Sequence, residues 1–99
     1  MPTKQVTLHD EAGRDYDAAF DWYLERSPQA AVRFGEAVER ALREIAAAPQ
    51  RWARGSHGTR RFLLRGFPFL LIYRDHNDEI QVLAVAHTSR RPGYWKTRI

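Results

Sequence analysis

Hydrophobic residues recur with a helical period through most of the first half of the chain. In residues 9–26 apolar side chains recur at steps of three and four positions, which is the spacing of one face of an amphipathic helix. They are Ala12, Tyr16, Ala19, Phe20, Tyr23 and Leu24. A second stripe with the same spacing lies in residues 28–48 and consists of Ala31, Phe34, Val38, Leu42 and Ile45. The pattern therefore predicts two consecutive helices.

Proline and short polar residues set the ends of these helices. Asp10 is the predicted N-cap of the first helix. Ser27 ends that helix because it precedes Pro28, and a residue before proline avoids helical backbone angles. Ser27 and Pro28 are also a suitable N-cap and first residue for the second helix, which Pro49 ends. Such a short connection predicts an antiparallel helical hairpin.

In the second half, short apolar runs alternate with turn residues, which is typical of β-strands. The runs are residues 60–65, 69–74 and 80–87, and they follow a predicted loop at residues 49–58. Residues 4–8 also alternate and predict a strand before the first helix. Because the later runs are apolar on both faces, helices should cover one face of the sheet and other chain should cover part of the opposite face.

These elements predict one α+β domain spanning residues 1–99. Its order is a strand, the helical hairpin and a three-strand antiparallel meander (βααβββ). The helices should pack on one face of a mostly antiparallel sheet. The first strand should join that sheet at an edge or beside the last strand.

The composition excludes several classes of site. The chain contains no cysteine, so it has neither disulfides nor thiolate metal ligands. Its histidines lie in four separate segments, at His9, His57, His76 and His87, and we expect no metal site and no cofactor. Neither a signal peptide nor a membrane span is visible, so we expect a cytoplasmic protein with no membrane partner.

The charge is distributed unevenly along the chain. Residues 1–50 carry 6 basic and 9 acidic side chains, whereas residues 51–99 carry 10 basic and 3 acidic ones. A basic half dominated by arginine favours phosphate or carboxylate partners, since the guanidinium group binds both through paired hydrogen bonds. The alternative interpretation is an ordinary solvated surface.

Several residues of the basic half are candidates for binding a nucleic acid or a protein target. They are Arg60, Arg61, Arg65, Arg74, Arg90, Arg91 and Trp95. If the arginines emerge on the face that the helices leave open, they form one basic surface whose binding depends strongly on salt. Alternatively, they point to both faces and protect the strand edges against aggregation.

The segment VAHTSRRPGYW contains the residue types that phosphodiester cleavage requires. Attack by an RNA 2′-hydroxyl needs a base, an acid and positive charge near the phosphate. His87 and Tyr94 are the candidate proton-transfer groups, and Arg90 is a candidate phosphate clamp. In the structural alternative, His87 is hydrogen-bonded at a strand end, Tyr94 packs on the sheet and the arginines are solvated.

Four stretches of the sequence resemble the RelE/ParE superfamily of bacterial toxins, often called plasmid stabilisation proteins. They are VTLHDEAGRDYDAAFDWY, RFGEAVERALREIAAAP, RRFLLRGFPFLLIYR and VLAVAHTSRRPGYWKTR. Together they span nearly the whole chain, and the spacing of GFPFLLIYR to AHTSRRPGYW is the most specific part. The resemblance implies a small α+β domain with a helical hairpin on an antiparallel sheet, as the hydrophobic pattern also predicts.

Members of the superfamily either cleave mRNA, usually in the ribosome, or poison DNA gyrase. The ribonuclease pattern has arginines where this chain has Leu70 and Thr88. Its loop arginine and its tyrosine match Arg90 and Tyr94. The histidine after the last strand, His87, and the FPF…IYR signature are closer to the ParE branch.

The resemblance therefore implies a growth-inhibiting toxin of a type II toxin–antitoxin module, neutralised by a cognate antitoxin and directed at DNA gyrase. Two alternatives stay open: an mRNA endoribonuclease that uses His87 and Tyr94 with arginine clamps, and an inactive relative that only forms complexes. The antitoxin should dock on an exposed sheet edge or in the groove between hairpin and sheet. A heterotetramer or a larger complex is the expected assembly.

Overall fold

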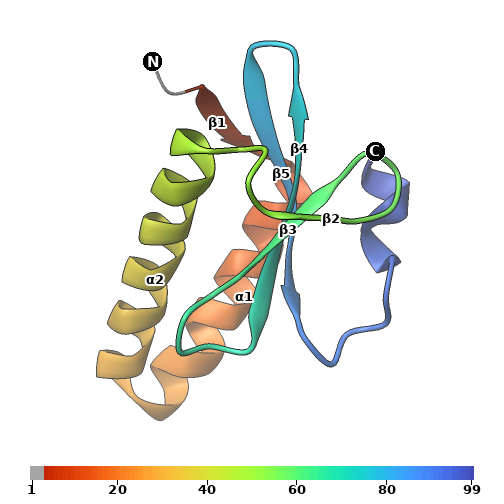
Figure 1. The fold of residues 1–99 in the computed structure, drawn as a ribbon. Coiled ribbons are helices and arrows are strands. Elements are labelled where there is room, and N and C mark those ends of the chain that lie inside the picture. The colour runs from red at the N-terminus through yellow and green to blue at the C-terminus, as the bar shows by residue number, and fades with distance from the viewer. Residues whose placement is uncertain (1–3) are drawn as a thin grey trace.

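A computed structural model gives the fold and describes residues 4–99. Its elements are β1 (Gln5–Leu8), α1 (Asp10–Arg26), α2 (Pro28–Ala47), β2 (Ala53–Arg54), β3 (Arg60–Leu63), β4 (Phe69–His76), β5 (Glu79–His87) and the 3-10 helix η1 (Tyr94–Arg98). Figure 1 shows the helical hairpin on one side of the sheet and η1 on the other. The predicted α+β class is confirmed. Within the described range, no helix is long and apolar enough to cross a membrane.

The sheet contains five strands in the order β1-β5-β4-β3-β2. β1 runs parallel to β5, and the other neighbouring strands are antiparallel. β1 therefore lies at an edge and beside the last strand, as predicted. The hydrophobic pattern does not predict β2 or η1. β2 has two residues and lies in the loop expected at residues 49–58, and so short a strand has no alternating pattern.

The helix ends agree with the sequence signals, with one correction. The N-cap of α1 is His9, and Asp10 is the first helical residue. The Nδ1 atom of His9 accepts a hydrogen bond from the backbone N–H of Glu11 at 3.0 Å, so an imidazole nitrogen replaces the usual cap oxygen. Ser27 caps α2 as predicted, because its hydroxyl oxygen accepts from the N–H of Ala30 at 3.2 Å.

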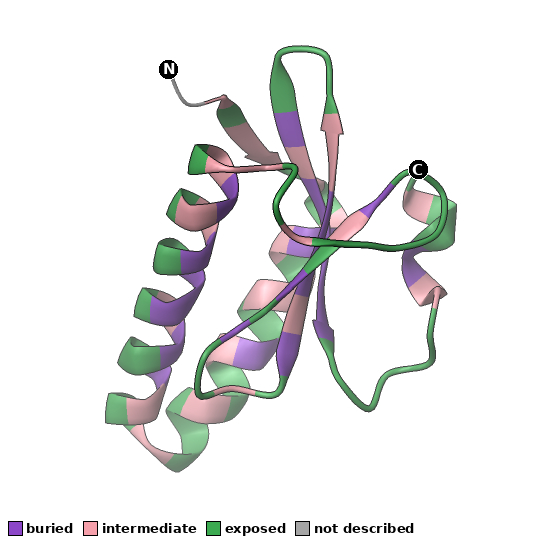
Figure 2. Cartoon of the chain, viewed as in Figure 1, coloured by how far each residue is buried: buried purple, intermediate pink, exposed green. Residues whose placement is uncertain are grey.

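The larger hydrophobic core lies between the helical hairpin and the sheet. Figure 2 shows α2 with its buried side toward the sheet and its outer side exposed. Phe34 of α2 and Tyr73 of β4 are fully buried in this core, and the Tyr73 hydroxyl donates to the carbonyl of Pro49 at 2.6 Å. Leu24, which the helical period assigns to the apolar face, is 46% exposed near the end of α1.

A smaller apolar cluster covers part of the opposite face of the sheet. Its buried residues are Ile72, Leu83, Ala84 and Trp95. Leu83 is an extra residue in β5, because Ile72 pairs with Ala84 while Tyr73 pairs with Val82. This bulge places two consecutive residues on the face that η1 covers. The predicted second covering layer is therefore the C-terminal segment of the chain.

β5 extends beyond β1 and leaves an open edge. The pairing with β1 ends where Leu8 lies opposite Val82, whereas β5 continues to His87. Backbone groups at such an edge need partners from side chains, water or another strand. Helix α1 packs against β5, so its side chains are available to this edge.

Candidate functional site at the open edge of β5

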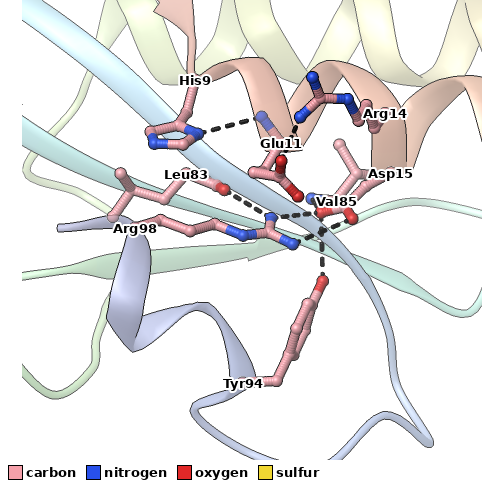
Figure 3. Close-up of polar contacts among 8 residues, drawn as sticks. All are labelled: His9, Glu11, Arg14, Asp15, Leu83, Val85, Tyr94 and Arg98. Atoms are coloured by element: carbon pink, nitrogen blue, oxygen red, sulfur yellow. Dashed lines mark hydrogen bonds and ion pairs between the residues drawn. The ribbon is translucent and has the colours of Figure 1, made fainter.

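Asp15 of α1 supplies partners to the open edge of β5. Its carboxylate accepts hydrogen bonds from the backbone N–H of Val85 at 3.0 Å and from the Tyr94 hydroxyl at 3.2 Å. Arg98 forms an ion pair with this carboxylate at 2.7 Å and donates to the carbonyl of Leu83 at 2.9 Å. Figure 3 shows these side chains converging on the edge. We call Asp15, Tyr94 and Arg98 the Asp15 cluster, and it joins α1, β5 and η1.

The Asp15 cluster is largely shielded from water. The side chains of Arg98 and Asp15 are 10% and 14% exposed. A buried ion pair holds a fold together only when further hydrogen bonds satisfy its charges, and the backbone of β5 provides them here. Burial is the main reason that the pKa of Tyr94 is raised to about 12, with the Asp15 charge acting in the same direction and Arg98 against it. At neutral pH Tyr94 is therefore an uncharged hydrogen-bond donor.

The raised pKa of Tyr94 predicts a loss of stability in alkaline solution. The folded pKa, about 12, lies above the ordinary value of 10.0. This contribution is therefore complete below pH 10 and is lost as the pH rises to about 12. Phenolate absorbance checks it, since subtracting the titration curve of Tyr94→Phe from that of the parent should leave a midpoint near pH 12. A midpoint near pH 10 would place the hydroxyl in water.

His87, the other candidate proton-transfer group, has separate partners. Its Nδ1 atom accepts a hydrogen bond from the backbone N–H of Ser89 at 3.0 Å, and the Ser89 hydroxyl lies 2.7 Å away. When Nδ1 of a neutral imidazole accepts, the proton is on Nε2. The ring meets Phe69 edge-on at 5.1 Å between centroids, and Phe69 belongs to the core under the helices. His87 therefore points toward the helix side of the sheet.

The candidate arginines point to both faces of the sheet, because neighbouring positions on a strand alternate. Arg61 lies opposite Ile72, which faces η1, and it lines a pocket there with Arg90 and Arg91. Arg74 follows Ile72 by two residues and has the same orientation. Its Nε donates to the side chain of Gln81 at 3.1 Å.

Two of the arginines lie elsewhere. Arg60 pairs with the core residue Tyr73 and donates to the carbonyl of Trp52 at 2.9 Å. Arg65 forms an ion pair with Glu44 of α2 at 3.2 Å. Of the two alternatives, the arginines therefore follow the second and point to both faces, and only some of them share one basic surface. Trp95, a predicted target contact, is 7% exposed and packs in the smaller core.

The pocket on the sheet face opposite the helices is lined by basic side chains. We call it the open-face pocket, and its volume is about 240 Å³. Three arginines line it together with the sheet residues Leu70, Ile72 and Ala86, and no aspartate or glutamate does. The Arg90 guanidinium carbon lies 4.0 Å from the ring centroid of Tyr94, a cation–π geometry that holds this arginine at the rim.

A second hollow lies on the helix side, between α1 and the ends of β4 and β5. We call it the α1 groove, and its volume is about 410 Å³. It is lined mainly by apolar side chains, including Ala18, Trp22 and Phe69, and it reaches Val85 on the open edge. Trp22 is 52% exposed, and the guanidinium carbon of Arg26 lies 3.8 Å from the centroid of its ring. This is the groove that the sequence predicts between the hairpin and the sheet.

Neither Asp15 nor Arg98 is among the candidate site residues that the sequence predicts. A signal for Asp15 exists, however, because it follows Ala12 by three positions and precedes Ala19 by four. A carboxylate on the buried stripe of a helix requires a cation or N–H groups as partners. For Arg98, one of several arginines near the C-terminus, we find no comparable signal.

Comparisons with known proteins place these features in one family context. The family profile described as "ParE toxin of type II toxin-antitoxin system, parDE" matches residues 6–92. The chain is 28% identical over 91 residues to Toxin ParE2 of Mycobacterium tuberculosis, in strains CDC 1551 / Oshkosh and ATCC 25618 / H37Rv, covering 91% of this chain and 87% of the relative. A solved structure, "Chromosomal ParDE TA system from P. aeruginosa", superposes with a TM-score of 0.75 at 25% identity, covering 86% of this chain and 96% of the other.

Proposed function

The chain belongs to the family of ParE toxins of type II toxin–antitoxin systems, and we propose that it arrests growth by binding DNA gyrase. The observation that carries the proposal is the family match over residues 6–92, which includes the helical hairpin, the sheet and both arginines of the loop after β5. The site of action is then the cytoplasm, where gyrase acts on the chromosome.

The environments of the two candidate proton-transfer groups support an action by binding. Transesterification of RNA needs a base and an acid positioned at one phosphate. The Tyr94 hydroxyl donates to Asp15 instead, and the Nδ1 atom of His87 accepts from Ser89. Leu70 and Thr88 also stand where the ribonuclease pattern has arginines. Each group has a structural partner, so a catalytic role is unnecessary to explain its position.

Expression of the chain without an antitoxin tests the proposal in cells. Growth should stop, plasmid recovered under denaturing conditions should be linearised or should lose supercoils, and mRNA 5′ ends should stay unchanged. His87→Ala should be as toxic as the parent at equal abundance. Arrest with supercoiled plasmid, new mRNA ends and relief by His87→Ala would overturn the proposal in favour of a ribonuclease. Harmless overexpression would indicate an inactive relative.

We further propose that the cognate antitoxin docks in the α1 groove. Asp15 already accepts from the N–H of Val85, so an added strand would pair with the C-terminal end of β5, where the alternation of the ladder directs the N–H of His87 out of the same edge. An extended segment can add to such an edge while its side chains fill the adjacent apolar hollow. Arg90 at the rim favours a segment that also carries a carboxylate. A heterotetrameric or larger assembly stays a prediction.

A further inference from the structure

We propose that the open-face pocket binds the phosphodiester backbone of a nucleic acid without cleaving it. Arg61 comes from β3, whereas Arg90 and Arg91 come from the loop after β5, so the fold brings distant cations to one cavity. None of the three forms an ion pair with any residue in the described range. The cavity thus gathers positive charge that no carboxylate in residues 4–99 neutralises through an ion pair.

The chemistry of the lining favours phosphate. Arginine presents a planar fork that matches two phosphate oxygens, and the three arginines line the pocket together with the apolar sheet residues Leu70, Ile72 and Ala86. An apolar floor strengthens the attraction, because Coulomb energy rises as the surrounding dielectric constant falls. The guanidinium group of Arg90 is held by its contact with the Tyr94 ring, which lowers the entropy lost on binding.

A continuous polyanion fits the wider charge distribution better than a short acidic peptide does. Residues 51–99 carry 10 basic and 3 acidic side chains. Arg74 lies on the same face as the pocket and also lacks an ion pair in residues 4–99. A fourth arginine therefore lies on the face that carries the pocket, and a nucleic acid backbone presents one charge at every nucleotide to such a group of cations.

Binding without cleavage follows from the orientation of the nearest titratable groups. His87 reaches the rim of the pocket, but its ring packs against Phe69 on the helix side. Tyr94 faces the pocket with its ring, while its hydroxyl passes the edge of β5 to Asp15. No base and acid are then aligned on a phosphate held by the arginines. For the identity of the nucleic acid the inference rests on the proposed function, which makes it the DNA of the gyrase complex.

Anisotropy of a short fluorescent DNA duplex, titrated with the purified chain at several salt concentrations, tests the inference in the absence of gyrase. Three phosphate contacts predict that the logarithm of the affinity falls with the logarithm of the salt concentration with a slope of about −2.7, and Arg61→Ala with Arg91→Ala should reduce its magnitude by about 1.8. Arg40→Ala with Arg43→Ala removes the same charge from the exposed face of α2 and should leave the slope unchanged.

Every other outcome either overturns the inference or identifies the nucleic acid that binds. Equal slopes for the two double variants, or binding of polyglutamate in place of DNA, would overturn the inference. A parallel titration with single-stranded RNA distinguishes the kinds of nucleic acid. Equal affinity for RNA and duplex DNA would show that the pocket binds the phosphate backbone of either, whereas a higher affinity for the duplex would show that it prefers DNA. Cleavage of that RNA would overturn the claim of binding alone. A chain that poisons gyrase but does not bind DNA refutes this inference and leaves the proposed function intact.

Discussion

Replacing Asp15 with alanine should lower the free energy of unfolding by about 3 kcal/mol, the usual cost of breaking a buried ion pair. The substitution leaves the Arg98 guanidinium without its carboxylate at a site where that side chain is 10% exposed. It also removes the acceptor of the Val85 N–H and of the Tyr94 hydroxyl. Urea denaturation followed by tryptophan fluorescence measures the loss.

The matched control is Arg14→Ala, at the residue immediately before Asp15 on α1. Arg14 pairs with Glu11, but its side chain is 70% exposed, so the expected change is within about 0.5 kcal/mol. A double-mutant cycle that combines Asp15→Ala with Arg98→Met separates the interaction between these two side chains from their other contacts. It should give a coupling energy of about 2 kcal/mol. An Asp15→Ala variant as stable as Arg14→Ala would show that the Asp15 cluster does not hold η1 to the fold.

Replacing Ala18 with arginine should abolish neutralisation by the antitoxin while leaving the toxin active. Ala18 lies on the exposed side of α1 and lines the α1 groove, so a long charged side chain fills the groove without entering the core. We expect the affinity for the cognate antitoxin to fall by at least about 100-fold, equivalent to about 3 kcal/mol. Co-expression gives the cellular measurement, since growth arrest should persist in the presence of the antitoxin.

Ala47→Arg is the control for this substitution. Ala47 is exposed at the end of α2, where a positive charge is favourable for the helix dipole. This variant should be neutralised like the parent. If Ala18→Arg also binds the antitoxin with the affinity of the parent, the antitoxin docks elsewhere, and the free edge of β1 becomes the next candidate.

The helices follow from periodicity, because each buries one face and the spacing of its apolar residues indicates that face. The main strands follow from short apolar runs between turn residues, since β4 and β5 are buried on both faces. Ser27 and Pro28 likewise set the break between α1 and α2 by local chemistry. By contrast, the backbone of η1 is held by long-range contacts, chiefly the packing of Trp95 and the ion pair of Arg98 with Asp15. The sequence of residues 94–98 alone contains no pattern that would predict these contacts with Asp15 and with the sheet.

The candidate site was harder to predict, because the pairing register of the strands determines which side chains lie on the same face of the sheet. Arg60 and Arg61 are adjacent in sequence, yet one lies opposite Tyr73 and the other opposite Ile72, which places them on opposite faces. A shift of one residue would exchange them. The grouping of Arg61 with Arg90 and Arg91 therefore requires the three-dimensional structure, although the basic character of the second half is visible in the composition.

The most direct test of the central claim is a supercoiling assay with purified gyrase, relaxed plasmid and ATP. The account predicts that the purified chain slows supercoiling and that detergent and protease then release linear plasmid. The same chain mixed beforehand with its antitoxin should have no effect. Supercoiling at the full rate, with an excess of toxin that is folded and still binds the antitoxin, would contradict the assignment of gyrase as the target.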